Sequence, residues 1–517
     1  MRSPDTLTPS DIVASGLCIG CGGCAAKGMA WDRYGQRKPS KATLDHYRHA
    51  GPVPASSPRQ THQPENARQP GCRDKLGVTK GSSGSQTTPK FPDEGRGSVS
   101  TGPMLNAGPR GGTSETFATT CPFSPTARNE DQLAATRFPA ARHHDPRLGR
   151  YEANYVGHAH QPPFRERGSS GGMVSWVAAD LLASGRIDGV AHVIPSTGDR
   201  LFHYRISRTP DQILEGARSR YYPVDLAEVL HEIRTTPGRY AIVGIPCFIK
   251  AVSLLREQDP VLNERITHLL GLFCGHMKSA QFVDSFAWQL GVDRNEVRAV
   301  EYRRKDPDRP ANWYTAHLDL NDGTARWQDW FHLADGDWGA GFFQNSACDA
   351  CDDVVAECAD VSFGDAWVEP YSSDGRGTNV VIVRSPEIAA RIATAIEDGQ
   401  LDLKGVDADF IANTQAAGFR QRRDGLAYRL TWQKRRITPI KRVAPRADGH
   451  PSRRRAIYRT RAAIARWSHR MAWAANRLNW PPLYTRWARA SLYIYQALAY
   501  KRGRLGRWLA KLDGVEG

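Results

Sequence analysis

The chain has 517 residues, a length that allows two or three domains with a substantial core. Residues 1–9 lack the apolar run of a secretory signal. No segment approaches the roughly 18 consecutive apolar residues of a spanning helix, so none is expected. We therefore expect a reducing, cytoplasmic location, in which the ten cysteines serve metal or redox chemistry rather than disulfides.

The formal net charge of +16 is unevenly distributed along the chain. Residues 431–517 contain 21 Lys or Arg and 3 Asp or Glu, a net of +18, whereas the rest of the chain has a net of −2. The sequence therefore predicts a near-neutral, enzyme-like body followed by a basic C-terminal tail.

Near the N-terminus, Cys18, Cys21 and Cys24 follow the pattern C-x2-C-x2-C. This spacing wraps the backbone so that three thiolates can reach three irons of a [4Fe–4S] cube. Bacterial ferredoxin runs continue with a cysteine before a proline, and Cys121-Pro122 is the only such pair in the chain. Cys121 is therefore predicted as the fourth ligand. A zinc site and buried free cysteines are the weaker alternatives.

Residues 28–116 separate these cysteines and are predicted to form a disordered insert. Gly and Pro supply 20 of the 66 residues in 51–116, and Phe91 is the only aromatic residue there. Such a composition cannot bury enough apolar surface to offset chain entropy. Cys72 in this segment is interpreted as a free thiol, and order is expected to resume near Phe117.

From residue 165 onward, apolar patterns alternate between helical and strand periods. Apolar residues at helical spacing over 174–182 predict an amphipathic helix after a Gly-rich turn. Apolar runs predict strands at 189–194, 240–244, 268–273, 359–364 and 380–384, and a helix at 248–256. Strands that alternate with helices indicate an α/β body.

A second group of cysteines lies within this body. Cys247 and Cys274 each follow a predicted strand, and the carboxyl ends of strands form the ligand crevice of an open α/β sheet. Cys348 and Cys351, in a loop ahead of a later strand, would complete a four-thiolate site. Cys358 competes with Cys247 for the fourth position, and the strand-end location favours Cys247. Either cysteine alone could equally be a small buried hydrophobic residue.

Arg-Gly-Ser-Ser-Gly-Gly at 167–172 is a candidate phosphate cradle, because glycines allow close approach and the following helix N-terminus favours an anion. It would suit the pyrophosphate of a flavin dinucleotide, and 216–222 adds cations and aromatic rings. Segment 302–305 could hold an acidic substrate or form an exposed charged edge. His276 is a candidate proton donor, although a supporting role is favoured. The candidate flavin contacts are Arg167, Gly168, Ser169, Ser170, Gly171, Gly172, Arg218 and Tyr221.

Together these motifs resemble the coenzyme F-420 hydrogenase/dehydrogenase beta-subunit family, which includes divinyl-chlorophyllide and hydroxymethyl-chlorophyll reductases. The resemblance covers about residues 10–27 and 117–410, and it is most specific at 167–172, 244–247, 271–274, 348–353 and 359–367. It implies a flavoenzyme with FAD beside a [4Fe–4S] cluster and a ferredoxin-type cluster before it. The implied ligands are Cys247, Cys274, Cys348 and Cys351 for the flavin-proximal cluster, and Cys18, Cys21, Cys24 and Cys121 for the other. Loop 167–172 would contact FAD.

The expected architecture is α/β. It comprises a ferredoxin-like iron–sulfur segment (1–27 and 117–150), the disordered insert (28–116), two parts of a mixed α/β FAD and [4Fe–4S] body (151–235 and 236–430), and a basic helical tail (431–517). We predict an oxidoreductase that passes electrons from a ferredoxin-type donor through two [4Fe–4S] clusters to FAD and on to a small organic acceptor or the deazaflavin coenzyme. The alternatives are a non-catalytic electron-transfer subunit of a larger complex, for example one linked to polysaccharide biosynthesis, and a structural zinc protein.

The tail mixes arginines with Trp467, Trp473, Trp480, Trp487 and Trp508. Its periodicity predicts a helix that is interrupted at Pro481-Pro482 and resumes over 483–500. Basic helices with aromatic anchors bind anionic membrane surfaces, gaining on the order of 1 kcal/mol per well-placed Lys or Arg. A peripheral position at the inner face of the membrane is favoured equally with a hairpin packed on the body or on a protein partner. Nucleic acid ranks last, because the chain carries no recognisable nucleic-acid module.

Overall fold

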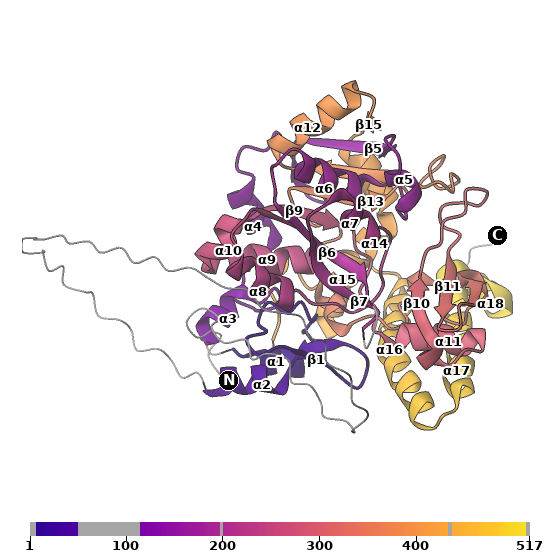
Figure 1. Cartoon of the computed structure of the whole chain (residues 1–517). Helices are drawn as coiled ribbons and strands as arrows, with labels where there is room; N and C mark the ends of the chain where they lie inside the picture. The colour runs from indigo at the N-terminus through magenta and orange to yellow at the C-terminus, as the bar shows by residue number, and fades with distance from the viewer. Residues whose placement is uncertain (1–6, 50–113, 197–199, 433–436, 513–517) are drawn as a thin grey trace, which may run out of the picture.

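The computed structural model describes residues 7–49, 114–196, 200–432 and 437–512. At its centre is an eight-stranded sheet with the order β15-β5-β14-β13-β9-β8-β6-β7 (Figure 1). Four neighbouring strands are parallel, namely β13 (Val361–Asp365), β9 (Ile266–Leu272), β8 (Tyr240–Gly244) and β6 (Gly189–Pro195). Antiparallel strands flank them, with β14 (Asn379–Val383), β5 (Ala153–Ala159) and β15 (Leu401–Gly405) on one side and β7 (Phe202–Ser207) on the other.

Helices cover both faces of this sheet, which explains why its central strands are continuously apolar. Successive side chains of a strand point to opposite faces, so Leu269 joins one hydrophobic core and Leu270 the other. The core around Leu270 contains α6 (Met173–Ala183) and α12 (Pro386–Glu397). The core around Leu269 contains α8 (Ala227–Thr235) and α9 (Pro246–Gln258). The predicted α/β organisation of the body is confirmed, and its predicted strands and helices lie within two residues of those observed.

The N-terminal part contains α1 (Pro9–Ala14), β1 (Met29–Trp31), β2 (Arg37–Pro39), α2 (Lys41–His49), α3 (Ser114–Thr120) and α4 (Glu130–Arg137). The prediction that disorder begins at residue 28 is therefore wrong, since β1 and β2 pair as a hairpin and α2 follows. The reason is tertiary packing: the Thr43 hydroxyl donates to the Gly28 carbonyl at 2.8 Å, and Arg37 pairs with Asp225 at 2.8 Å. The predicted disorder of 50–113, which includes Cys72, lies outside the described residues.

A smaller antiparallel sheet lies to one side of the large sheet, with β10 (Val297–Glu301), β11 (Thr315–Leu320) and β12 (Ala325–Asp329). It shares a core with α11 (Gln281–Leu290) and with the tail helices α16 (Ser452–Arg477) and α17 (Pro481–Tyr500), which lie beside it in Figure 1. The inner face of the tail hairpin is fully buried at Tyr484 and Ala472. The predicted helical tail is confirmed, and the hairpin is packed on the body. Among the described residues, no helix has the length and hydropathy of a transmembrane span.

The remaining elements are β3 (His143–Asp145), β4 (Gly149–Tyr151), α5 (Phe164–Arg167), α7 (Pro210–Glu215), α10 (Pro260–Arg265), α13 (Ala408–Thr414), α14 (Ala416–Arg422), α15 (Asp424–Trp432) and α18 (Gly503–Leu512).

Candidate functional site

The first quartet, Cys18, Cys21, Cys24 and Cys121, comes together from two segments that are far apart in the sequence. Cys18–Cys24 is a loop after α1, and Cys121 follows α3. Burial raises the pKa of the Cys24 thiol well above its ordinary value, and the nearby Cys21, Cys18 and Cys121 raise it further. The four thiols are therefore within electrostatic reach of one another.

Glycine and backbone contacts hold this loop on the body. Gly20 has φ +78°, and a Cβ there would lie 2.4 Å from the Arg37 carbonyl oxygen, so β2 can pass the loop only if residue 20 is glycine. The Leu226 N–H donates to the Cys21 carbonyl at 2.9 Å, which ties the loop to the start of α8. The N-terminal segment is thus joined to the face of the large sheet that α8 and α9 cover.

The second quartet is Cys247, Cys274, Cys348 and Cys351. Cys247 lies in the first turn of α9, directly after β8, and Cys274 directly follows β9. Since β8 and β9 are adjacent and parallel, these two cysteines share the carboxyl edge of the sheet. Cys348 and Cys351 lie on and just after the short 3-10 helix Ser346–Ala350, and the Met277 N–H donates to the Cys348 sulfur at 3.4 Å.

The second quartet is buried and mutually coupled. Burial raises the pKa of Cys247 well above its ordinary value, and Cys351, Cys274 and Cys348 raise it further. Burial also raises the pKa of Cys348 to about 12. Cys21 of the first quartet also raises the pKa of Cys247, so the two quartets lie close to each other.

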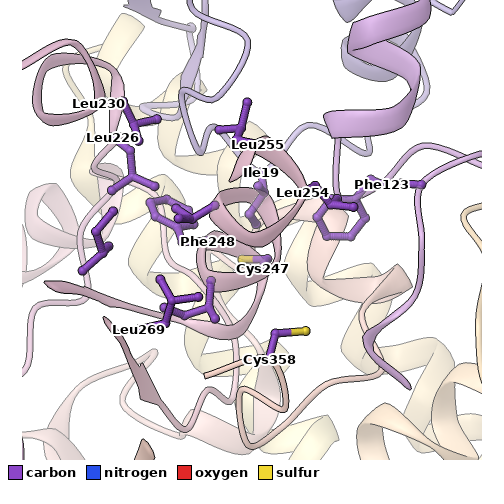
Figure 2. Packing of buried hydrophobic residues seen from close by; sticks show 14 of the residues in the cluster. Ile19, Phe123, Leu226, Leu230, Cys247, Phe248, Leu254, Leu255, Leu269 and Cys358 are labelled. Carbon is purple, nitrogen blue, oxygen red and sulfur yellow. The ribbon is translucent and has the colours of Figure 1, made fainter. Parts of the chain in front are cut away.

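Cys358, the competitor of Cys247, has different surroundings. Both residues belong to the apolar cluster beneath the sheet (Figure 2). The Cys358 sulfur lies 3.9 Å from the Glu130 carbonyl oxygen, and its pKa is raised by burial and then by the carboxylates of Glu130 and Asp353. Cys247 is thus grouped with three thiols, and Cys358 with carboxylates.

The chemistry of the donor set fits iron–sulfur clusters. All nine described cysteines are free thiols. Within the described residues, no three or more His, Cys, Asp or Glu side chains converge in a way that could hold a single metal ion. A [4Fe–4S] cluster takes one thiolate on each of its four irons, a requirement that each group of four thiols would satisfy.

Cations that the sequence did not single out surround the second quartet. Arg422, at the end of α14, donates from Nη2 to the carbonyl oxygens of Cys274 at 3.1 Å and Gly275 at 2.8 Å. Asp352, which follows Cys351, accepts from Lys441 Nζ at 3.1 Å and from the Arg442 N–H at 3.0 Å. Burial opposes ionisation of Asp352, but Lys441 and Arg442 outweigh it and lower its pKa. The sequence signal for these cations was the pair of acids Asp352 and Asp353 directly after Cys348-x2-Cys351, because buried acids need positively charged partners.

Loop 167–172 joins α5 to α6 and is fixed by its neighbours. The Lys305 ammonium donates to the Ser170 carbonyl at 2.8 Å, and the Ser219 N–H donates to the Ser169 hydroxyl at 2.7 Å. Gly172 has φ +81°, and a Cβ there would lie 2.4 Å from the Phe164 carbonyl carbon. Glycine at position 172 is therefore required by the fold itself. The structure brings segment 216–222 against the loop.

Three arginines lie beside this loop with one carboxylate among them. Arg218 pairs with Glu301, and its pKa is lowered by burial and then by the positive charges of Arg167 and Arg304. The excess positive charge makes this side of the loop complementary to an anion.

The aromatic candidate Tyr221 is not free to move. Its ring lies 4.7 Å from that of Trp338 and 5.4 Å from that of Tyr302, inside the core that the tail shares. Trp338 also stacks on His276 at 4.3 Å. Burial and the cation of Lys278 lower the pKa of His276 well below its ordinary value. Whether His276 supplies a proton or has a supporting role stays a prediction.

Segment 302–305 is not an exposed charged edge. Tyr302 is fully buried, Arg303 pairs with Asp365 at 3.0 Å, and Lys305 holds loop 167–172. Arg304 is the exposed residue of the segment. Most of these side chains therefore serve the fold, and Arg304 contributes to the arginine group.

Two profiles of one family match the chain. Both describe the coenzyme F420 hydrogenase/dehydrogenase beta subunit; the profile of its N-terminal part matches residues 154–231, and the profile of its C-terminal part matches residues 238–409. They include loop 167–172 and the second quartet, whereas the first quartet and the tail lie outside them. Comparison with curated proteins gives no match.

Among solved structures, the chain is similar to a chain of the xenon-derivatised F420-reducing [NiFe] hydrogenase complex from Methanosarcina barkeri. The TM-score is 0.45 at 17% identity, with 57% of this chain and 98% of that chain covered. Because the two profiles follow each other in order along one body, the body at residues 154–409 belongs to the coenzyme F420 hydrogenase/dehydrogenase beta-subunit family.

Proposed function

We propose that this chain is an iron–sulfur flavoprotein oxidoreductase that carries two [4Fe–4S] clusters and FAD. The observation that carries the proposal is the grouping of eight cysteines into two neighbouring quartets, in which Cys21 of the first raises the pKa of Cys247 in the second. Membership of the family supports an oxidoreductase in general. When bound, the clusters would supply one-electron transfer, and the flavin would couple it to two-electron chemistry on an organic molecule.

The first quartet would hold the outer cluster and the second quartet the flavin-proximal one. Cys247 is proposed as the fourth ligand of the second cluster, because the other three thiols raise its pKa, whereas the pKa of Cys358 is raised by the carboxylates of Glu130 and Asp353. The protein keeps water from the second quartet by burying Cys247, Cys348 and Cys351 to at most 8% exposure. Low solvent access is one of the factors that set cluster potentials.

FAD is proposed to bind against loop 167–172. Arg167, Arg218 and Arg304 would offer positive charge to its pyrophosphate, and the N-terminus of α6 would add to it. Tyr221 would line this site from a fixed position in the aromatic core.

The proposed electron donor is a ferredoxin or another one-electron carrier. The proposed acceptor is a small organic molecule, with the deazaflavin coenzyme included. The competing proposal is a non-catalytic subunit that only relays electrons within a larger complex, for example one linked to polysaccharide biosynthesis. Turnover of an acceptor by the isolated chain with a reduced donor would favour the enzyme, and bound cofactors without turnover would favour the relay role.

Anaerobic purification followed by iron, acid-labile sulfide, flavin and zinc analysis tests the cofactor proposal. The expected result is about eight irons and one flavin per chain, in line with two four-iron clusters. Stoichiometric zinc without iron would contradict it and favour the structural zinc protein.

We also propose that the tip of the tail hairpin contacts an anionic membrane surface. Trp473, Leu478 and Trp480 at this tip are 39%, 65% and 47% exposed. Residues 452–512 contain no Asp or Glu, so the arginines of the outer face are not offset within the tail. Exposed aromatic anchors among basic residues suit the headgroup region of anionic bilayers.

Flotation with vesicles that contain anionic lipid tests this contact in the full-length chain. Truncation is unsuitable, since the hairpin buries Tyr484 in the body core. Wild type is expected to float in a salt-sensitive manner, and a Trp473→Ser, Trp480→Ser variant to lose most of its binding. Trp327→Ser, at the 57% exposed Trp327 of β12, is the matched control and should float like wild type. Equal flotation of all three proteins would contradict the tip contact, and absence of flotation in wild type would favour a protein partner.

A further inference from the structure

Arg422 is a buried cation whose partners lie in the second quartet. It ends α14 and is 3% exposed. Besides its hydrogen bonds to the carbonyl oxygens of Cys274 and Gly275, its Nη2 lies 3.8 Å from the Cys274 sulfur. Within the described residues, no Asp or Glu forms an ion pair with Arg422.

A buried guanidinium without a carboxylate partner is costly unless another anion compensates its charge. The four sulfurs of the second quartet are the available source of that charge. Nη2 of Arg422 lies 3.8 Å from the Cys274 sulfur and is held there by its hydrogen bonds to the carbonyl oxygens of Cys274 and Gly275. The geometry thus pairs one fixed cation with one set of four thiolates, and a cluster bound by four thiolates is such an anion.

The first quartet has a different electrostatic environment. Lys38 donates from Nζ to the Cys18 carbonyl at 2.6 Å, which places a cation at one thiol. Carboxylates lie near both quartets: Asp32 and Asp225 near the first, and Asp352 and Asp353 near the second. The two cations differ in their contacts, because Arg422 lies 3.8 Å from a thiol sulfur, whereas the hydrogen bond of Lys38 goes to a backbone carbonyl.

We propose that Arg422 raises the reduction potential of the cluster in the second quartet above that of the cluster in the first, and so directs electrons from the first to the second. Reduction adds negative charge to a cluster, and a nearby fixed cation stabilises the reduced state. The inference rests on the proposed function. Arg422 lies beyond residue 409, where the family profile ends, so it is assigned from its contacts in this chain.

The test is a redox titration of the purified holoprotein followed by electron paramagnetic resonance. A Cys21→Ser variant assigns the signals to the two clusters. In wild type, the second cluster is expected to be reduced at a higher potential than the first. Arg422→Gln should shift the second signal to lower potential and leave the first in place, and Arg422→Lys, which keeps the charge, should restore most of the shift. Arg420→Gln removes an exposed arginine of the same helix and should change neither potential.

An Arg422→Gln protein with a full iron content and unchanged potentials would overturn the inference. Loss of the second cluster in Arg422→Gln with its retention in Arg422→Lys, at a potential still above that of the first cluster, would support it, because the retained positive charge then keeps the order of the two potentials. Loss in both variants would overturn it in favour of a purely structural role. A wild-type protein without iron would instead refute the proposed function. That result differs from all of these outcomes, because they require iron in the wild-type protein.

Discussion

The first quartet is held by loops and very short elements, whereas the second is built into the edge of the largest sheet. Around the first quartet, β1 and β2 have three residues each, and Gly20 adopts a left-handed turn against β2. Around the second, β8 and β9 pair in parallel and end together. Strand pairing fixes the spacing of Cys247 and Cys274 directly, while the first quartet depends on how its loop packs on α8.

The ion pairs beside the two quartets also differ: the first has one pair, and the second has a network. Beside the first, Arg37 and Asp225 form one buried pair at 2.8 Å. Beside the second, Arg442 bridges Asp352 at 3.5 Å and Glu357 at 2.5 Å. The second quartet is thus part of a connected ionic network, so a change there should spread further than a change at the first.

The largest expected effect comes from removing one ligand of each quartet. Cys351→Ser should remove the second cluster and abolish reduction of FAD by a one-electron donor. Cys21→Ser should remove only the outer cluster, because the sheet that places the second quartet does not depend on Cys21. Iron analysis and electron paramagnetic resonance of the two variants measure this.

Cys358→Ser is the matched control for the ligand assignment. Its iron content should equal that of wild type, whereas Cys247→Ser should lose the second cluster. The opposite pattern would exchange the roles of the two cysteines.

A smaller effect, on stability, is expected from the ionic networks. Arg442→Leu leaves two buried carboxylates without this partner and should lower the free energy of unfolding by about 3–5 kcal/mol. Arg37→Leu leaves only Asp225 and should fall at the lower end of that range. Urea denaturation of the holoprotein measures both. Arg446→Leu, at an exposed position of the same segment as Arg442, should change stability by no more than about 0.5 kcal/mol. A greater loss for Arg37→Leu than for Arg442→Leu would reverse the comparison.

The smallest effect concerns His469 of α16, where the tail meets both regions. Its ring lies 3.1 Å from the Gln344 carbonyl oxygen near the second quartet and 3.5 Å from the Gln36 amide of the β1–β2 hairpin. Burial lowers the pKa of His469 to about 4. The folded state therefore binds fewer protons than the unfolded state between about pH 6.5 and 4, so this stability is present above pH 6.5 and lost as pH falls toward 4. The full loss is about 3 kcal/mol, at about 1.4 kcal/mol per pKa unit.

Thermal or urea unfolding of wild type and His469→Gln across this pH range measures the contribution. The variant should be less sensitive to acid, and His192, whose pKa is also lowered to about 4 by burial, should supply part of the remaining slope. Identical pH profiles would show that His469 does not link the tail to the two regions.

Sequence reasoning located the elements of the body well because their signals are local. The runs at 240–244 and 268–273 are apolar on both faces, as strands under two helical layers must be, and they match β8 and β9 closely. It failed at residues 28–49, where the buried Thr43 bonds to Gly28 within the segment and the buried Arg37 pairs with Asp225, 188 positions away, contacts that local composition does not reveal.

The sequence by itself determined the α/β body, the helical tail and the eight cysteines with their spacing, because periodicity and short motifs are properties of neighbouring residues. Only the tertiary structure decided which thiols raise the pKa of Cys247, that the carboxylates of Glu130 and Asp353 act on the pKa of Cys358, and that Arg422 lies against Cys274. These outcomes depend on groups separated by as many as 228 positions in the chain. Burial and charge compensation act through space, so their strength is fixed only when the sheet, its loops and the tail have packed together.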